Sequence, residues 1–135
     1  MIKNLEHIGI AVQSKEEAIR LFSTLLGRKP YKSEIVASEG VETIFFGIGN
    51  IKIELLVSVS EESAVDRFLK TKGPGIHHIA FEVEDINASI QNSKENGFSP
   101  VSEIPKQGAD NKQIVFLHPK TAGGVLIEFC QGKEA

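Results

Sequence analysis

Two stretches of eight residues decide the fold, because each repeats the other: Leu5–Val12, LEHIGIAV, and Ile76–Val83, IHHIAFEV. In both stretches a histidine comes two residues after an aliphatic residue, and apolar residues then occupy the same alternate positions. This alternation is typical of a β-strand. The two histidines, His7 and His78, are 71 residues apart in a chain of 135. Self-similarity over half of the chain predicts two copies of one structural module.

A helix is expected directly after each of these two strands. Ser14 and Glu17 have the spacing of a capping box for a helix over about 15–26. Asp85 is a typical N-cap for a second helix over about 86–96. A glycine follows each segment and favours the end of a helix there.

The remainder of each half reads as three strands. The last two resemble a hairpin with a glycine-containing turn. The strand before them shows a weaker strand pattern. The expected strands lie at about 35–38, 44–46 and 52–56 in the first half, and at about 98–102, 115–117 and 126–130 in the second.

We therefore predict an α+β fold built from two paired βαβββ modules within one domain, residues 1–135. Module one covers about 3–58 and module two about 75–131. Between them, residues 60–73 have the pattern of a helical connector.

Composition excludes several classes of protein. The net charge of −3 does not suit a general nucleic-acid binder, which needs a basic surface. Cys130 is the only cysteine, so an intramolecular disulfide is impossible, as suits a reducing compartment. We see no apolar signal region at the N-terminus and no apolar run of about 20 residues that could span a bilayer. We expect a cytoplasmic protein with no membrane partner.

Strand alternation gives a specific prediction for four side chains. In each of the first strands, bulky residues occupy the face that a helix must cover, so His7 and His78 point to the opposite face, among small residues. By the same alternation, Glu54 and Glu128 oppose their apolar neighbours in the hairpins. Each module thus supplies one histidine and one glutamate to an open face.

Two imidazoles with two carboxylates suit a borderline or hard divalent ion. A single buried histidine is usually a core residue, and a single strand glutamate usually faces solvent. Here a histidine and a glutamate occupy equivalent positions in both halves of the chain. This repetition favours a metal site over two independent coincidences. A structural zinc site normally uses cysteines, of which the chain has too few. His77 falls on the helix-covered face, which predicts a packing or supporting role.

These residues resemble the vicinal oxygen chelate (glyoxalase/bleomycin resistance/dioxygenase) superfamily and, within it, the epimerase family that acts on methylmalonyl-CoA. The resemblance covers nearly the whole chain. Its most specific parts are residues 5–12, 49–56, 75–80, 116–120 and 123–128. It implies a curved open sheet around a metal-binding cleft. It also implies one divalent ion per chain, Co²⁺ first, with Zn²⁺, Ni²⁺ or Mn²⁺ as alternatives.

The resemblance further implies interconversion of (2R)- and (2S)-methylmalonyl-CoA, an acyl-CoA substrate, and a homodimer. Such a reaction needs an acid/base group on each face of a planar intermediate. Glu128 is implied as one such base as well as a metal ligand. The second would sit at Thr43 by ungapped comparison, so adjacent Glu42 is the candidate, although alternation sends Glu42 to the other face. His118 and Lys120 are implied in substrate binding.

Three alternatives remain on the sequence alone. Glyoxalase I, a lactoylglutathione lyase, can use a similar donor set on a glutathione hemithioacetal. A non-haem iron dioxygenase would use two histidines and one carboxylate. A metal-free module of the same fold could instead sequester a small molecule. The fold by itself does not decide among these.

Overall fold

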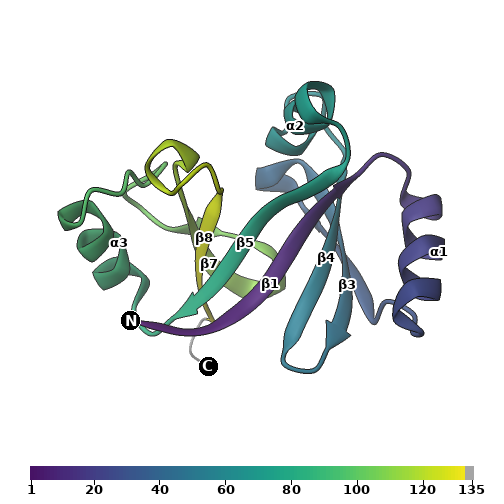
Figure 1. Cartoon of the computed structure of the whole chain (residues 1–135), viewed down its shortest axis with the longest axis horizontal. Helices are drawn as coiled ribbons and strands as arrows, with labels where there is room; N and C mark the ends of the chain where they lie inside the picture. Colours follow the sequence, from purple (N-terminus) through teal and green to yellow (C-terminus); the bar gives the residue numbers. More distant parts are fainter. Residues whose placement is uncertain (133–135) are drawn as a thin grey trace. The chain divides into compact units, whose positions relative to one another are not determined.

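The computed structural model describes residues 1–132. Its helices and strands follow the predicted order (Figure 1). They are β1 (Ile2–Val12), α1 (Lys15–Leu26), β2 (Lys32–Val36), β3 (Val41–Ile48), β4 (Ile51–Ser58), α2 (Ala64–Lys72), β5 (Gly75–Val83), α3 (Ile86–Glu95), β6 (Lys106–Gln107), β7 (Lys112–Leu117) and β8 (Ile127–Gly132). Short 3₁₀ turns lie at Ala37–Glu39, Ala109–Asn111 and Pro119–Thr121.

The α+β class and the two βαβββ modules are confirmed. Strand β1, helix α1 and strands β2, β3 and β4 form the first module, and β5, α3, β6, β7 and β8 form the second. Helix α2 occupies the predicted connector.

Contacts between residues divide the chain into two compact units. Unit 1 contains Met1–His7 and the chain from His78 onward, and unit 2 contains Ile8–His77. Strands β1 and β5 therefore each contribute residues to both units, so the units are not identical to the modules.

In unit 2, β3 pairs antiparallel with both β2 and β4. Helix α1 covers one face of these strands, where Ala18 packs with Ile44, Phe46 and Leu55. The neighbouring residues in each strand point to the opposite face. That face, which we call the Glu54 face, is defined by Thr43 and Phe45 of β3 together with their partners Leu56 and Glu54 of β4.

In unit 1, β8 pairs parallel with β5 and antiparallel with β7 (Figure 1). Helix α3 packs on one face through Ile86 and Ile90, against Val83, Val115 and other apolar side chains. The opposite face bears a smaller buried cluster of Ala80, Ile114 and Cys130.

The helix ends follow the predicted caps. The side chain of Ser14 accepts a hydrogen bond from the backbone N–H of Glu17 at 3.3 Å, and Gly27 ends α1 in the left-handed conformation. Asp85 accepts from the N–H of Ala88 at the start of α3. These contacts satisfy N–H groups that have no partner inside the helix.

The strand predicted at 98–102 is wrong. The first strand after α3 is β6, at Lys106–Gln107. Residues 99–101 do run beside β7, through hydrogen bonds from His118 N to Ser99 O and from Val101 N to Phe116 O. Pro100 between them forms only an isolated bridge with Leu117, and its nitrogen faces away from β7, a position in which a sheet tolerates proline.

No helix among the described residues is both long and apolar enough to cross a membrane.

Candidate metal centre

Three of the four predicted ligands meet in unit 1. His7 of β1, His78 of β5 and Glu128 of β8 are all buried, with at most 5% of each residue exposed. The two Nε2 atoms of the histidines are 3.0 Å apart. His78 Nε2 lies 3.3 Å from Glu128 Oε1, and His7 Nε2 lies 3.8 Å from Glu128 Oε2.

Strand pairing explains why His78 and Glu128 converge. The parallel register of β5 and β8 places Ala80 opposite Glu128. His78 is two residues before Ala80, so its side chain lies on the same face of the strands. Since α3 covers the other face, the small side chain of Ala80 leaves room beside the two functional groups. This is the face that the sequence pattern predicted.

The donor set fits a divalent transition metal. Two donors at about 2.1 Å from one ion lie about 3.0 Å apart at a right angle and about 3.4 Å apart at the tetrahedral angle. The separations from His78 Nε2 to its two neighbours match these values. Two imidazole nitrogens and a carboxylate oxygen, all buried, are ligands that Zn²⁺, Co²⁺, Ni²⁺ and Mn²⁺ accept.

Glu6 completes this arrangement, and sequence reasoning missed it. Its Oε1 lies 2.6 Å from Nδ1 of His7, and both side chains are buried. A carboxylate can only accept, so Nδ1 of His7 carries the proton and the lone pair is left on Nε2. Lys112 Nζ lies 4.0 Å from Glu6 Oε2 and compensates part of its charge. Carboxylates commonly orient metal-binding histidines in this way.

The fourth predicted ligand, Glu54, lies on β4 in unit 2. It is buried, and its partner across the strand pair is Phe45. In unit 1, the partner of Glu128 is likewise a phenylalanine, Phe116. The two glutamates thus occupy equivalent positions in the two modules, as the repeat predicted.

A lysine accompanies each of these phenylalanines, which the sequence reasoning also missed. Lys32 Nζ lies 4.7 Å from the ring centroid of Phe45, and Lys106 Nζ lies 5.9 Å from that of Phe116. Each lysine comes from the first strand after the helix of its module. A lysine, a phenylalanine and a glutamate therefore recur as a set.

Glu42, the predicted candidate for the second base, lies on β3 next to Thr43. On β3, Glu42 points to the same side as Ile44, which α1 covers, and not to the Glu54 face. Its carboxylate accepts a hydrogen bond of 2.9 Å from Lys15 at the start of α1. The ion pair gives Glu42 a partner on the helix side, where strand alternation predicted its side chain.

Two other predictions concern residues outside the cluster. The ring of His77 packs edge-on against Phe68 of α2, at 5.0 Å between centroids, which confirms the packing role. Burial lowers the pKa of His77. His118 and Lys120 are both exposed, on a turn held by the hydrogen bond from Thr121 Oγ1 to His118 O. That position leaves both side chains accessible to a ligand.

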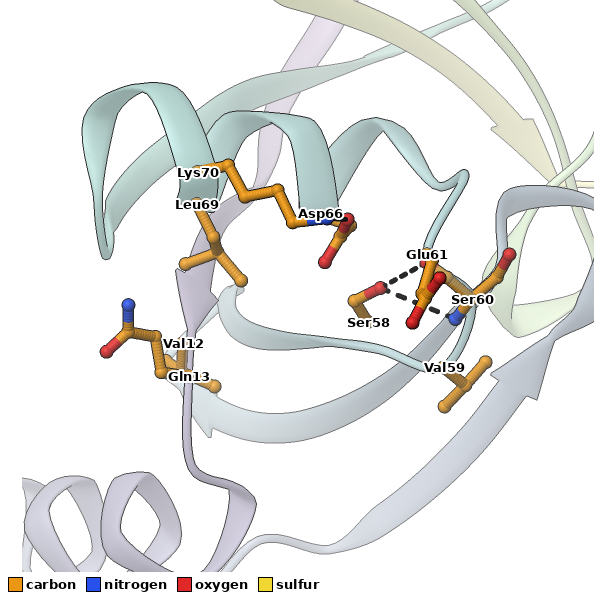
Figure 2. A pocket seen from close by; sticks show the side chains of 9 residues that line it. All are labelled: Val12, Gln13, Ser58, Val59, Ser60, Glu61, Asp66, Leu69 and Lys70. Carbon is orange, nitrogen blue, oxygen red and sulfur yellow. Dashed lines mark hydrogen bonds and ion pairs between the residues drawn. The ribbon is translucent and has the colours of Figure 1, made fainter.

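A pocket of about 510 Å³ lies elsewhere, in unit 2 (Figure 2). It is lined by residues of the ends of β1 and β4 and by α2, among them the ion pair of Lys70 and Asp66 at 2.9 Å. None of the predicted site residues lines this pocket.

Comparison with known proteins decides the family. The model of the Glyoxalase/Bleomycin resistance protein/Dioxygenase superfamily matches residues 6–116. The chain belongs to this superfamily. The predicted resemblance to its epimerases is also confirmed. This chain is 39% identical to the protein named methylmalonyl-CoA epimerase, mitochondrial, from Homo sapiens. The aligned part covers 94% of this chain and 73% of the human protein.

Two further relatives are also named as epimerases of methylmalonyl-CoA. An ethylmalonyl-CoA/methylmalonyl-CoA epimerase from Cereibacter sphaeroides is 41% identical to this chain. The aligned part covers 97% of this chain and 99% of that protein. The crystal structure of methylmalonyl-CoA epimerase from Mycobacterium tuberculosis superposes with a TM-score of 0.93. It is 32% identical, over 98% of this chain and 90% of that one.

Proposed function

We propose that the chain is a metal-dependent epimerase that interconverts (2R)- and (2S)-methylmalonyl-CoA. The observation that carries the proposal is the buried cluster of His7, His78 and Glu128, in a chain that is similar along most of its length to methylmalonyl-CoA epimerases. The ethylmalonyl-CoA/methylmalonyl-CoA epimerase among the relatives makes the ethyl homologue a second substrate to test.

Four residues would hold one divalent ion. His7, His78 and Glu128 have compatible separations within unit 1. Glu54 is proposed as the fourth ligand, because it is buried and repeats the position of Glu128 opposite a phenylalanine. A bound ion would act as a Lewis acid that neutralises the charge developing on the thioester and carboxylate oxygens of the substrate. Co²⁺ is our first expectation for its identity.

The residues of the chain then have separate tasks. Glu6 holds the proton on Nδ1 of His7, so that Nε2 keeps its lone pair for the ion. Glu128 exchanges a proton with the α-carbon on one face of the substrate. That carbon lies between a thioester and a carboxylate, so the electron pair left by the proton is delocalised into a planar enolate. Burial of the site excludes water and strengthens these electrostatic interactions.

The exposed turn at 118–120 is proposed to recognise the substrate. Lys120 is an exposed cation, and acyl-CoA substrates carry phosphates and, here, a carboxylate. The backbone N–H of His118 donates to Ser99 O at 2.7 Å, which fixes the start of the turn. A fixed turn places the ammonium group at a lower entropic cost than a flexible one.

Substrate preference tests the proposal. Metal-loaded protein should turn over methylmalonyl-CoA with a kcat/KM far above that for the hemithioacetal of methylglyoxal and glutathione. The reverse preference would move the assignment to a lactoylglutathione lyase. Tight binding of neither metal nor substrate would favour a metal-free binding module of the same fold.

A further inference from the structure

The pair of strands β7 and β8 extends the face of unit 1 that bears Glu128. Their antiparallel register pairs Phe116 with Glu128, and it pairs Lys112, at the start of β7, with Gly132. Cross-strand partners lie on the same face, and every second residue of a strand shares that face. Lys112 comes four residues before Phe116, so its side chain points to the same side of the strands as Glu128.

Gly132 leaves room for the long side chain of Lys112. A Cβ atom at Gly132 would lie 3.9 Å from Lys112 Nζ, so the ammonium group passes close to the glycine backbone. It ends 4.0 Å from Oε2 of Glu6. The side chains of Lys112 and Glu6 are only 16% and 10% exposed. Because water screens charges weakly at such positions, this pair attracts more strongly than a pair on the surface.

The turn before β7 fixes the position from which Lys112 extends. Asp110 and Asn111 have φ values of +61° and +55°, and they are the only non-glycine residues with a positive φ among residues 1–132. Aspartate and asparagine tolerate this left-handed conformation better than most side chains do. The backbone N–H of Gly108 closes the turn by donating to Lys112 O at 2.9 Å. Two costly conformations in succession are typical of segments whose geometry serves a function.

Lys112 is the outer end of a series of contacts that leads to the metal-binding nitrogen of His7. Glu6 contacts Lys112 through Oε2, and through Oε1 it accepts the Nδ1 proton of His7 at 2.6 Å. Each oxygen of the carboxylate thus has a positively polarised partner, which limits its rotation. The thiol of Cys130 on the same face adds no charge, because burial raises its pKa far above the usual range.

We infer that Lys112 is a positioning residue of the metal centre, which holds Glu6 in the orientation that His7 needs. The inference rests on the proposed function, because it requires an ion at Nε2 of His7. Without the ammonium group, the Glu6 carboxylate loses a partner and turns toward water. The Nδ1 proton of His7 is then held less firmly, and Nε2 is a poorer ligand. The ammonium group also repels a bound ion, but the adjacent negative charge of Glu6 offsets that repulsion.

A double-mutant cycle on metal affinity tests the inference. The affinity for Co²⁺ is measured by competition with a chelator in wild type, Lys112→Met, Glu6→Gln and the double variant. Methionine keeps an unbranched stem and removes the charge. Lys112→Met should weaken binding by about 10-fold, the lower end of what loss of an outer partner costs. In the Glu6→Gln background the same change should have almost no effect, because Lys112 acts through Glu6. Lys112→Arg should keep most of the wild-type affinity.

The control is Lys94→Met, which also removes a lysine paired with a glutamate, Glu103, but at an exposed position of unit 1. It should bind Co²⁺ as wild type does. Equal losses in both backgrounds, or unchanged or tighter binding in Lys112→Met, would overturn the inference while the proposed function stands. A loss in Lys112→Arg as large as that in Lys112→Met would also overturn it. A wild type that binds no divalent ion would overturn both proposals.

Discussion

His7 has a defined partner on each ring nitrogen. Its Nδ1 meets the Glu6 carboxylate at 2.6 Å, and its Nε2 faces His78 Nε2 at 3.0 Å. Two imidazole nitrogens that face each other inside a protein need either a shared proton or a cation between them. With the Glu128 carboxylate next to both rings, a divalent ion satisfies all three groups together.

Removing either histidine should therefore remove the metal. His7→Ala and His78→Ala should each lose tight binding of about one divalent ion per chain, as measured by elemental analysis after dialysis. His77→Ala is the matched control, because that ring packs on Phe68. Equal metal content in wild type and both ligand variants would show that the cluster is not a metal site.

Glu6 should affect metal affinity without binding the metal itself. Glu6→Gln weakens the hold on the Nδ1 proton of His7, and loss of such a partner typically costs about 10–100-fold in affinity. Competition with a chelator of known affinity measures the effect. Glu84→Gln removes the same charge from an exposed position in unit 1, so it should leave the metal affinity at its wild-type value. If both variants bind equally, Glu6 has no orienting role.

Glu128 is proposed both to bind the ion and to transfer protons, and one substitution separates these roles. Glu128→Gln keeps an oxygen donor of similar shape but cannot accept the α-proton. It should retain much of its metal while turnover of methylmalonyl-CoA falls by about 10²–10⁴-fold. Full metal content with near-normal turnover would identify Glu128 as a ligand alone.

At the scale of elements, the sequence predicted best where local chemistry determines the structure. Ser14 and Asp85 cap α1 and α3 as expected, because their side chains satisfy N–H groups within a few residues. The strand predicted at 98–102 was wrong because this segment pairs with β7 only at the bridge between Pro100 and Leu117, and an apolar pattern does not show how far such a pairing continues. Strand β6 has only two residues, both exposed, and so leaves no periodic signal.

Gly40 is the turn residue with the strictest steric requirement among those between β2 and β4. Its φ is +64°, and a Cβ there would lie 3.0 Å from Ser60 Cβ and 3.1 Å from Ser63 Cβ. Gly49 has a φ of +56° but nothing within 4 Å of such a Cβ. The two positions share the left-handed conformation and differ in the space around it.

Alanine at these positions should therefore cost different amounts. Gly49→Ala should lower the free energy of unfolding by about 1–2 kcal/mol, the usual penalty of the left-handed conformation. Gly40→Ala should cost about 1–3 kcal/mol more, because it adds overpacking against the N-cap residue of α2. Urea unfolding followed by circular dichroism measures both. An equal cost for the two variants would contradict the described packing at Gly40.

At the scale of the whole molecule, the internal repeat was the most informative feature of the sequence. It predicted the two βαβββ modules and brought His7, His78 and Glu128 together on the correct face. It could not predict Glu6, because a glutamate next to a histidine in a strand ordinarily points to the other face. It also could not predict that Lys32 lies over Phe45, because that contact depends on the register of β2 against β3. Register follows from long-range pairing, which one sequence does not reveal.

The most direct test of the account is α-proton exchange by the unaltered protein. Protein loaded with Co²⁺ is mixed with (2R)- or (2S)-methylmalonyl-CoA in D₂O, and the substrate is followed by proton NMR and by mass. The account predicts that the α-proton signal disappears, that the mass rises by one deuterium, and that either starting epimer gives a mixture of both. Metal-free protein should do none of this. A metal-loaded protein that leaves the α-proton and the configuration of both epimers unchanged would contradict the account.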